Sequence, residues 1–238
     1  MSSPNIHIFE TSQELASTAA ETFIKQAKGV IEEFGRFTVA LAGGSTPKRA
    51  YEILATQHHD TLDWNKVHAF FGDERTVPPD HEDSNYRMAQ DTLLSHVHIG
   101  SVHRMRGELD PSEAAALYEK DLEAFFGGPP RFDLVLLGIG EDGHTASLFP
   151  GTPALDVRDR WAVENPVEKL GTSRITLTVP AINAATRVVF LVAGEGKAKA
   201  LKEILEVDAE TRDCPAKLIR PVGKLIWMSD AAAASSLS

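Results

Sequence analysis

The chain has a single cysteine, Cys214, so it can form neither an internal disulfide framework nor a cysteine-rich metal site. Pro215 follows this cysteine directly, and nothing around it indicates an activated thiol. The sequence also lacks any apolar run near the eighteen or so residues that a membrane span requires. We therefore expect no thiol chemistry and no membrane partner.

Targeting signals and excess positive charge are missing as well. The first residues, MSSPNIHIFETSQEL, show neither a basic patch before an apolar stretch nor an arginine-rich pattern, so we expect a cytoplasmic protein. The 24 basic residues face 34 acidic ones, and the net charge of −10 disfavours nucleic acid as a partner. A few cationic groups focused in one cleft can still hold a phosphate. A small anionic molecule is therefore the expected partner.

Short apolar runs alternate with helical patterns along the whole chain, without an internal repeat or a low-complexity linker. This alternation predicts a mostly parallel sheet covered by helices, in one α/β domain over residues 1–238. Strands are predicted at residues 6–9, 37–41, 67–71, 134–137, 175–179, 188–192 and 225–228. Helices are predicted at residues 11–35, 47–55, 86–94 and 110–126, and from about residue 197 onward.

Four polar loops, AGGST, GDER, GEDGH and GEGK, follow predicted strands. Ligands of open α/β sheets bind beyond the carboxyl ends of the strands, so we expect these loops to face one cleft. In the first loop, Gly43, Gly44, Ser45 and Thr46 lead into a helix, whose free N–H groups favour an anion such as phosphate. A plain tight turn capped by Ser or Thr is an equally good interpretation of this loop alone. A nucleophilic Ser45 is disfavoured, because the G-x-S-x-G pattern would need glycine where Pro47 stands.

Asp142 and His144 lie two residues apart in a glycine-flanked loop. In an extended segment their side chains project to the same side, so the carboxylate can orient the imidazole. A histidine held in this way can act as a general base near neutral pH. The alternative is a loop histidine that only caps a turn, and the loop by itself does not decide between the two.

The same loop contains a G-x-G-x-x-G pattern over residues 138–143, which is typical of dinucleotide-binding sites. Glu141 and Asp142 would place two negative charges where the pyrophosphate must lie. The following HTASLFPG segment also reaches proline and glycine too soon for the long helix of such a site. A dinucleotide is therefore disfavoured.

Three cationic residues, Arg75, Arg174 and Lys197, each lie at the edge of a predicted strand or the start of a predicted helix. Each of them alone is more often a surface charge. Together with the glycine loop they could form a phosphate clamp, because all of them are expected on the cleft side of the sheet.

With these segments assembled, the chain resembles the 6-phosphogluconolactonase family, within the wider family that also holds the glucosamine-6-phosphate deaminases. The resemblance rests on five segments in the expected order: LAGGSTPKRAYEIL, FFGDERTVPPDHEDSNYRMAQDTLL, LLGIGEDGHTASLFPG, RITLTVPAIN and VAGEGKAKAL. It implies a three-layer α/β/α fold of the sugar-phosphate isomerase/CoA-transferase-like type. The implied reaction is hydrolysis of 6-phospho-D-glucono-1,5-lactone to 6-phospho-D-gluconate in the oxidative pentose phosphate pathway, with no metal and no organic cofactor.

The resemblance also implies roles for single residues. His144 would be the base that activates water, with Asp142 orienting it. Residues 43–46, Arg75 and Lys197 would match the substrate and phosphate contacts of the family, and Arg174 is a further candidate. Asp73 matches the acid that the deaminases use as a ring-opening and proton-shuttling base, and the resemblance leaves a supporting or a purely structural role open for it here.

Two alternatives remain at this point: an amino-sugar phosphate deaminase or isomerase, and a sugar-phosphate sensor without catalysis. The deaminases carry a glutamate shortly after the histidine, in a stretch resembling FNEP, whereas this chain has SLFP with Phe149 in place of that glutamate. Arg75 also stands where the deaminases usually have tyrosine. Both differences favour the lactonase. We expect a monomer, although the sequence leaves association open.

Overall fold

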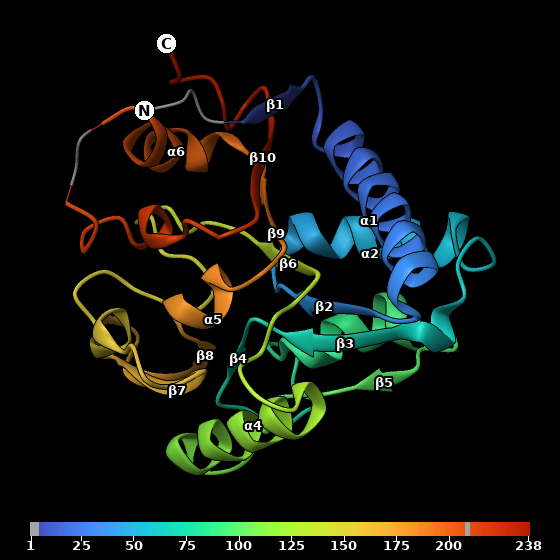
Figure 1. The fold of residues 1–238 in the computed structure, drawn as a ribbon. Helices are drawn as coiled ribbons and strands as arrows, with labels where there is room; N and C mark the ends of the chain where they lie inside the picture. Colours follow the sequence, from blue (N-terminus) through green and yellow to red (C-terminus); the bar gives the residue numbers. More distant parts are fainter. Residues whose placement is uncertain (1–4, 208–209) are drawn as a thin grey trace.

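A seven-stranded sheet forms the centre of the protein, seen in a computed structural model that describes residues 5–207 and 210–238 (Figure 1). Every paired neighbour in this sheet runs parallel. The mostly parallel sheet predicted from the sequence is therefore confirmed. Its strand order is β1 (Ile6–Phe9), β10 (Lys224–Asp230), β9 (Arg187–Val192), β6 (Leu134–Leu137), β2 (Phe37–Leu41), β3 (Val67–Phe71) and β5 (Ser101–Val102).

Helices cover both faces of this sheet and create two separate apolar cores. In β9, Val188 and Phe190 face one core, whereas Val189 and Leu191 face the other. This double burial explains why the central strands are continuous apolar runs, and it gives the predicted three-layer α/β/α arrangement. One face carries α1 (Ser12–Phe34), α2 (Ser45–Gln57), α3 (Asn85–Ala89) and the π-helix η2 (Gln90–Leu94). The other carries α4 (Pro111–Phe126), α5 (Val179–Asn183) and α6 (Ala198–Leu205).

The long helices begin and end at the capping residues that the sequence indicates. The Thr11 hydroxyl accepts a hydrogen bond from the Glu14 N–H, and Gly35 ends α1 with a left-handed φ of 79°. Asp110 caps α4 in the same way. The predicted helix at residues 86–94 differs, because its second half is wound as a π-helix. Short 3-10 turns are η1 (Trp64–Lys66), η3 (Pro153–Asp156), η4 (Glu168–Leu170), η5 (Glu195–Lys197) and η6 (Pro215–Leu218).

A second, antiparallel sheet lies beside the main one and was not predicted. It consists of β4 (Asp73–Arg75), β8 (Thr172–Leu177) and β7 (Ala162–Val167). The strand predicted at residues 175–179 is wrong at its end, because α5 starts at Val179. The Thr178 side chain accepts from the Ala181 N–H, and Pro180 occupies the first turn, so both residues favour a helix start.

The topology brings the candidate loops to one edge of the molecule. The loops after β2, β3, β6 and β9 all leave the carboxyl edge of the parallel sheet. Only Gly72 separates β3 from β4, so the antiparallel sheet begins directly at this edge. In the part of the chain that the structure describes, no helix is both long and apolar enough to cross a bilayer.

Candidate active site

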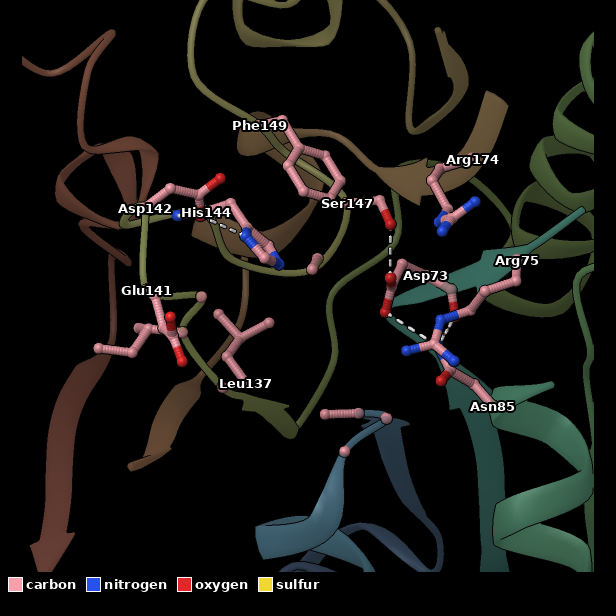
Figure 2. A pocket seen from close by; sticks show the side chains of 18 of the residues that line it. Asp73, Arg75, Asn85, Leu137, Glu141, Asp142, His144, Ser147, Phe149 and Arg174 are labelled. Atoms are coloured by element: carbon pink, nitrogen blue, oxygen red, sulfur yellow. Dashed lines mark hydrogen bonds and ion pairs between the residues drawn. The ribbon is translucent and has the colours of Figure 1, made fainter. Parts of the chain in front are cut away.

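A cleft of about 590 Å³ opens where these loops meet the antiparallel sheet (Figure 2). Each of the four loops contributes to its lining, and so does β8. The expectation that separate loops face one cleft therefore agrees with the structure. The predicted residues that line it are Gly43, Gly44, Asp73, Arg75, Asp142, His144, Arg174 and Lys197.

His144 and Asp142 form a close pair on one wall of the cleft. The His144 Nδ1 atom lies 2.5 Å from Asp142 Oδ1, and the same oxygen accepts from the His144 N–H at 3.2 Å. Gly140 holds this tight turn, because its N–H donates to the His144 carbonyl at 2.8 Å. A Cβ atom at Gly140 would lie only 2.0 Å from His144 Nδ1. The loop can therefore wrap around the pair only because residue 140 has no side chain.

Burial keeps the imidazole of His144 neutral. The ring stacks on Phe149, with centroids 4.1 Å apart, and burial lowers the pKa of His144 to about 4. The nearby Asp73 carboxylate opposes this shift, whereas Lys197 and the two cleft arginines add to it. A neutral ring whose Nδ1 faces a carboxylate carries its proton on Nδ1, which leaves the Nε2 lone pair free to accept one.

Arg75 and Arg174 lie side by side on the opposite wall (Figure 2). They are paired residues of the antiparallel strands β4 and β8, so their side chains share one face. Arg75 donates to the Asp83 carbonyl and Arg174 to the Ser173 carbonyl. Across residues 5–207 and 210–238, neither guanidinium forms an ion pair with a carboxylate. Burial and the charge of Arg75 lower the pKa of Arg174, so an anion between the two would relieve their repulsion.

Asp73 lies between these two walls and is held by hydrogen bonds. Its Oδ2 accepts from the Ser147 hydroxyl at 2.6 Å, and its Oδ1 accepts from the Asn85 amide at 3.2 Å. The adjacent Glu74 accepts from the N–H groups of Asn85 and Tyr86, which ties α3 to β4. Asp73 is therefore a fixed negative charge in an otherwise cationic part of the cleft.

Two of the predicted residues, Ser45 and Thr46, do not line this cleft. They form the start of α2 and border a separate cavity of about 200 Å³, together with Arg49 and Asp230. The physical reason is that the helix begins at Ser45, so the loop brings Ala42, Gly43 and Gly44 to the cleft but not the two hydroxyl residues. Sequence reasoning also missed three polar side chains of the lining: Asn85, Ser147 and Lys169. Lys169 and Asn85 reach the site through contacts between distant elements. Ser147 lies only three residues after His144, and its contact with Asp73 across the cleft is what sequence reasoning missed.

The two remaining candidates for chemistry are a metal site and the Cys214 thiol. Among the described residues, no cluster of three or more histidine, cysteine, aspartate or glutamate side chains is arranged to hold a metal ion. Cys214 is buried, and burial together with the Glu203 carboxylate raises the pKa of its thiol. That direction agrees with the inert thiol expected from the sequence.

Comparison with known proteins agrees with the family resemblance found in the sequence. The family described as glucosamine-6-phosphate isomerases/6-phosphogluconolactonase matches residues 10–227. A 6-phosphogluconolactonase of Synechocystis sp. is 45% identical over 241 residues, which cover 98% of each chain. One from Nostoc sp. is 46% identical over 95% of this chain and 92% of its own. The solved structure of 6-phosphogluconolactonase from Trypanosoma cruzi superposes with a TM-score of 0.90 at 30% identity, covering 100% of this chain and 98% of that one.

Proposed function

Because the chain belongs to the family of glucosamine-6-phosphate isomerases and 6-phosphogluconolactonases, we propose that it hydrolyses 6-phospho-D-glucono-1,5-lactone to 6-phospho-D-gluconate. This reaction belongs to the oxidative pentose phosphate pathway. One observation carries the proposal: a single cleft has the two kinds of group that the reaction needs on opposite walls. One wall holds a neutral imidazole paired with a carboxylate. The other holds two guanidinium groups that, within the described residues, have no carboxylate partner.

His144 is the general base in this proposal. Its Nε2 accepts a proton from water as the water oxygen attacks the lactone carbonyl, and Asp142 stabilises the imidazolium that forms. The tetrahedral intermediate then expels the ring oxygen, which takes the proton back from Nε2 and becomes a hydroxyl group. The carboxylic acid formed at the carbonyl carbon ionises at neutral pH. The ester bond is thus cleaved with no reactant other than water.

The cationic wall is the proposed site of the substrate phosphate. Arg75 and Arg174 would hold it, Lys197 would add positive charge, and Gly43 and Gly44 line the same cleft. Binding energy from this remote group would hold the lactone carbonyl near His144, so the cations should influence kcat as well as KM. We propose that the protein acts on this small phosphorylated lactone as a cytoplasmic monomer.

The first test of this proposal compares three measurements on the purified protein. Freshly generated 6-phosphogluconolactone should be hydrolysed faster than its spontaneous rate, followed by acid release at constant pH. Ammonia release from glucosamine 6-phosphate, the deaminase outcome, should be absent. Tight binding of 6-phosphogluconate without lactone turnover would instead identify a sensor and reject the enzymatic proposal.

The ionisation of His144 provides a second, independent prediction. Because burial lowers its pKa to about 4, the imidazole should remain neutral through pH 6 and take up its proton only near pH 4. Activity that depends on this base is then present above pH 4 and is lost as the pH falls through that value. An NMR titration of the free protein measures the pKa of the ring directly. An Asp73→Asn variant should lower it further, since Asp73 stabilises the protonated form. A His144 midpoint near 6.5 would contradict the buried geometry.

A further inference from the structure

Lys169 reaches the His144–Asp142 pair from a different part of the fold. It lies in η4, the turn between β7 and β8, and lines the cleft. Its Nζ atom forms an ion pair with Asp142 Oδ2, whereas His144 uses the other oxygen, Oδ1. The two carboxylate oxygens of Asp142 therefore serve two different partners, and Lys169 fixes the one that His144 does not use.

The same ammonium group also contacts the other support of the imidazole. Lys169 Nζ lies 4.8 Å from the centroid of the Phe149 ring, within the range of a cation–π contact. Phe149 in turn stacks on His144. One cation thus touches both groups that determine the orientation of the His144 ring: the carboxylate at its Nδ1 edge and the aromatic ring against its face.

We propose that Lys169 is a positioning residue that holds Asp142, and through it the His144 ring, in the orientation that leaves Nε2 open to water. This inference rests on the proposed function of His144 as a base. A carboxylate pinned at Oδ2 cannot rotate freely about its Cβ–Cγ bond, so Oδ1 stays aligned with Nδ1. With Oδ1 held at Nδ1, the imidazole keeps its proton on Nδ1.

A role as a direct ligand of the substrate phosphate fits these contacts less well. The charge of Lys169 is already neutralised by Asp142, so a phosphate would have to displace a carboxylate. Arg75 and Arg174 offer the phosphate two guanidinium groups that have no such competitor in the described chain. Lys169 is therefore expected to act on the chemical step through Asp142.

The test compares Lys169→Met, which keeps an unbranched side chain one atom shorter and removes its charge, with the conservative Lys169→Arg. The charged groups lining the cleft around His144 are Asp73, Arg75, Glu141, Asp142, Lys169, Arg174 and Lys197, and only one of them changes. In Lys169→Met, kcat should fall by roughly ten- to a hundredfold, because small misplacements of a base are costly, while KM changes by about twofold or less. Lys169→Arg should restore most of the loss. Lys199→Met is the matched control, since Lys199 lies on the exposed surface of α6 and should leave both constants unchanged.

Nitrogen NMR of the free protein measures the pKa and the tautomer of His144. A purely structural contact of Lys169 would leave both unchanged. Removing the cation should raise the pKa of His144 and weaken its preference for the Nδ1–H tautomer, with Lys169→Arg close to wild type. An increase in KM at constant kcat, or an unchanged His144 pKa and tautomer, would overturn the proposal. Because this NMR measurement needs no substrate, it decides the role of Lys169 even if the lactone assay fails.

Discussion

His144→Ala should lower kcat for lactone hydrolysis by about a hundred- to ten-thousandfold, the usual contribution of a positioned general base. The physical reason is that water must then lose its proton without the Nε2 acceptor that the cleft provides. The groups proposed to hold the phosphate lie on the other wall and remain in place. The affinity for 6-phosphogluconate, measured by calorimetry, should therefore change much less than kcat.

His98→Ala is the matched control for this experiment, because His98 is exposed and does not line the cleft. Its kinetic constants should equal those of the wild type. If His144→Ala retained wild-type kcat while binding the product normally, another group would have to be the base. A loss of both product binding and secondary structure would show only that the variant fails to fold, so circular dichroism accompanies the assay.

Gly140→Ala should abolish most of the activity although it adds only a methyl group. The new Cβ would lie 2.0 Å from His144 Nδ1 and 2.6 Å from Asp142 Oδ1, closer than any real contact allows. The residue has no left-handed φ, so the backbone itself accepts alanine and the strain falls on the side-chain pair. Displacing a base by about 1 Å can cost roughly a hundredfold in rate, which is the fall in kcat expected here.

Gly29→Ala separates this steric effect from the general effect of adding a methyl group. Gly29 lies within α1, is exposed, and a Cβ atom at this position would have no neighbour within 4 Å. Activity should be unchanged, and the free energy of unfolding should rise by about 0.5–1 kcal/mol, since alanine loses less entropy than glycine in a helix. If Gly140→Ala were as active as Gly29→Ala, the close packing of residue 140 against His144 would not be a feature of the working enzyme.

The parallel sheet and the chemistry at its edge follow from local signals in the sequence. Continuous apolar runs such as residues 37–41 indicate strands buried on both faces, and Thr11 and Asp110 mark helix starts by their capping chemistry. The two-residue spacing of Asp142 and His144 indicates their pairing as one of two interpretations, and the structure forms the pair through a tight turn and not through the extended segment expected. These features depend on residues that are close together in the sequence, so sequence patterns can predict them.

The antiparallel sheet and the contacts it creates depend on pairing between distant segments. β7 contains Pro166, which disfavours a strand by propensity, and β4 is only three residues long. The register that sets Arg75 opposite Arg174 joins residues about a hundred positions apart, and no periodicity reveals it. The same holds for Lys169, whose partner Asp142 lies in another loop. Tertiary packing therefore brings Arg75 beside Arg174 and Lys169 beside Asp142.

The proposed reaction requires one cleft to place the lactone carbonyl at His144 while Arg75 and Arg174 hold the phosphate. A crystal structure of the protein with bound 6-phosphogluconate would reveal this arrangement. We expect the carboxylate of the product within hydrogen-bonding distance of His144 Nε2 and its phosphate between the two guanidinium groups. A product bound in this cleft with its phosphate away from both arginines, or with its carboxylate remote from His144, would refute the proposed mechanism.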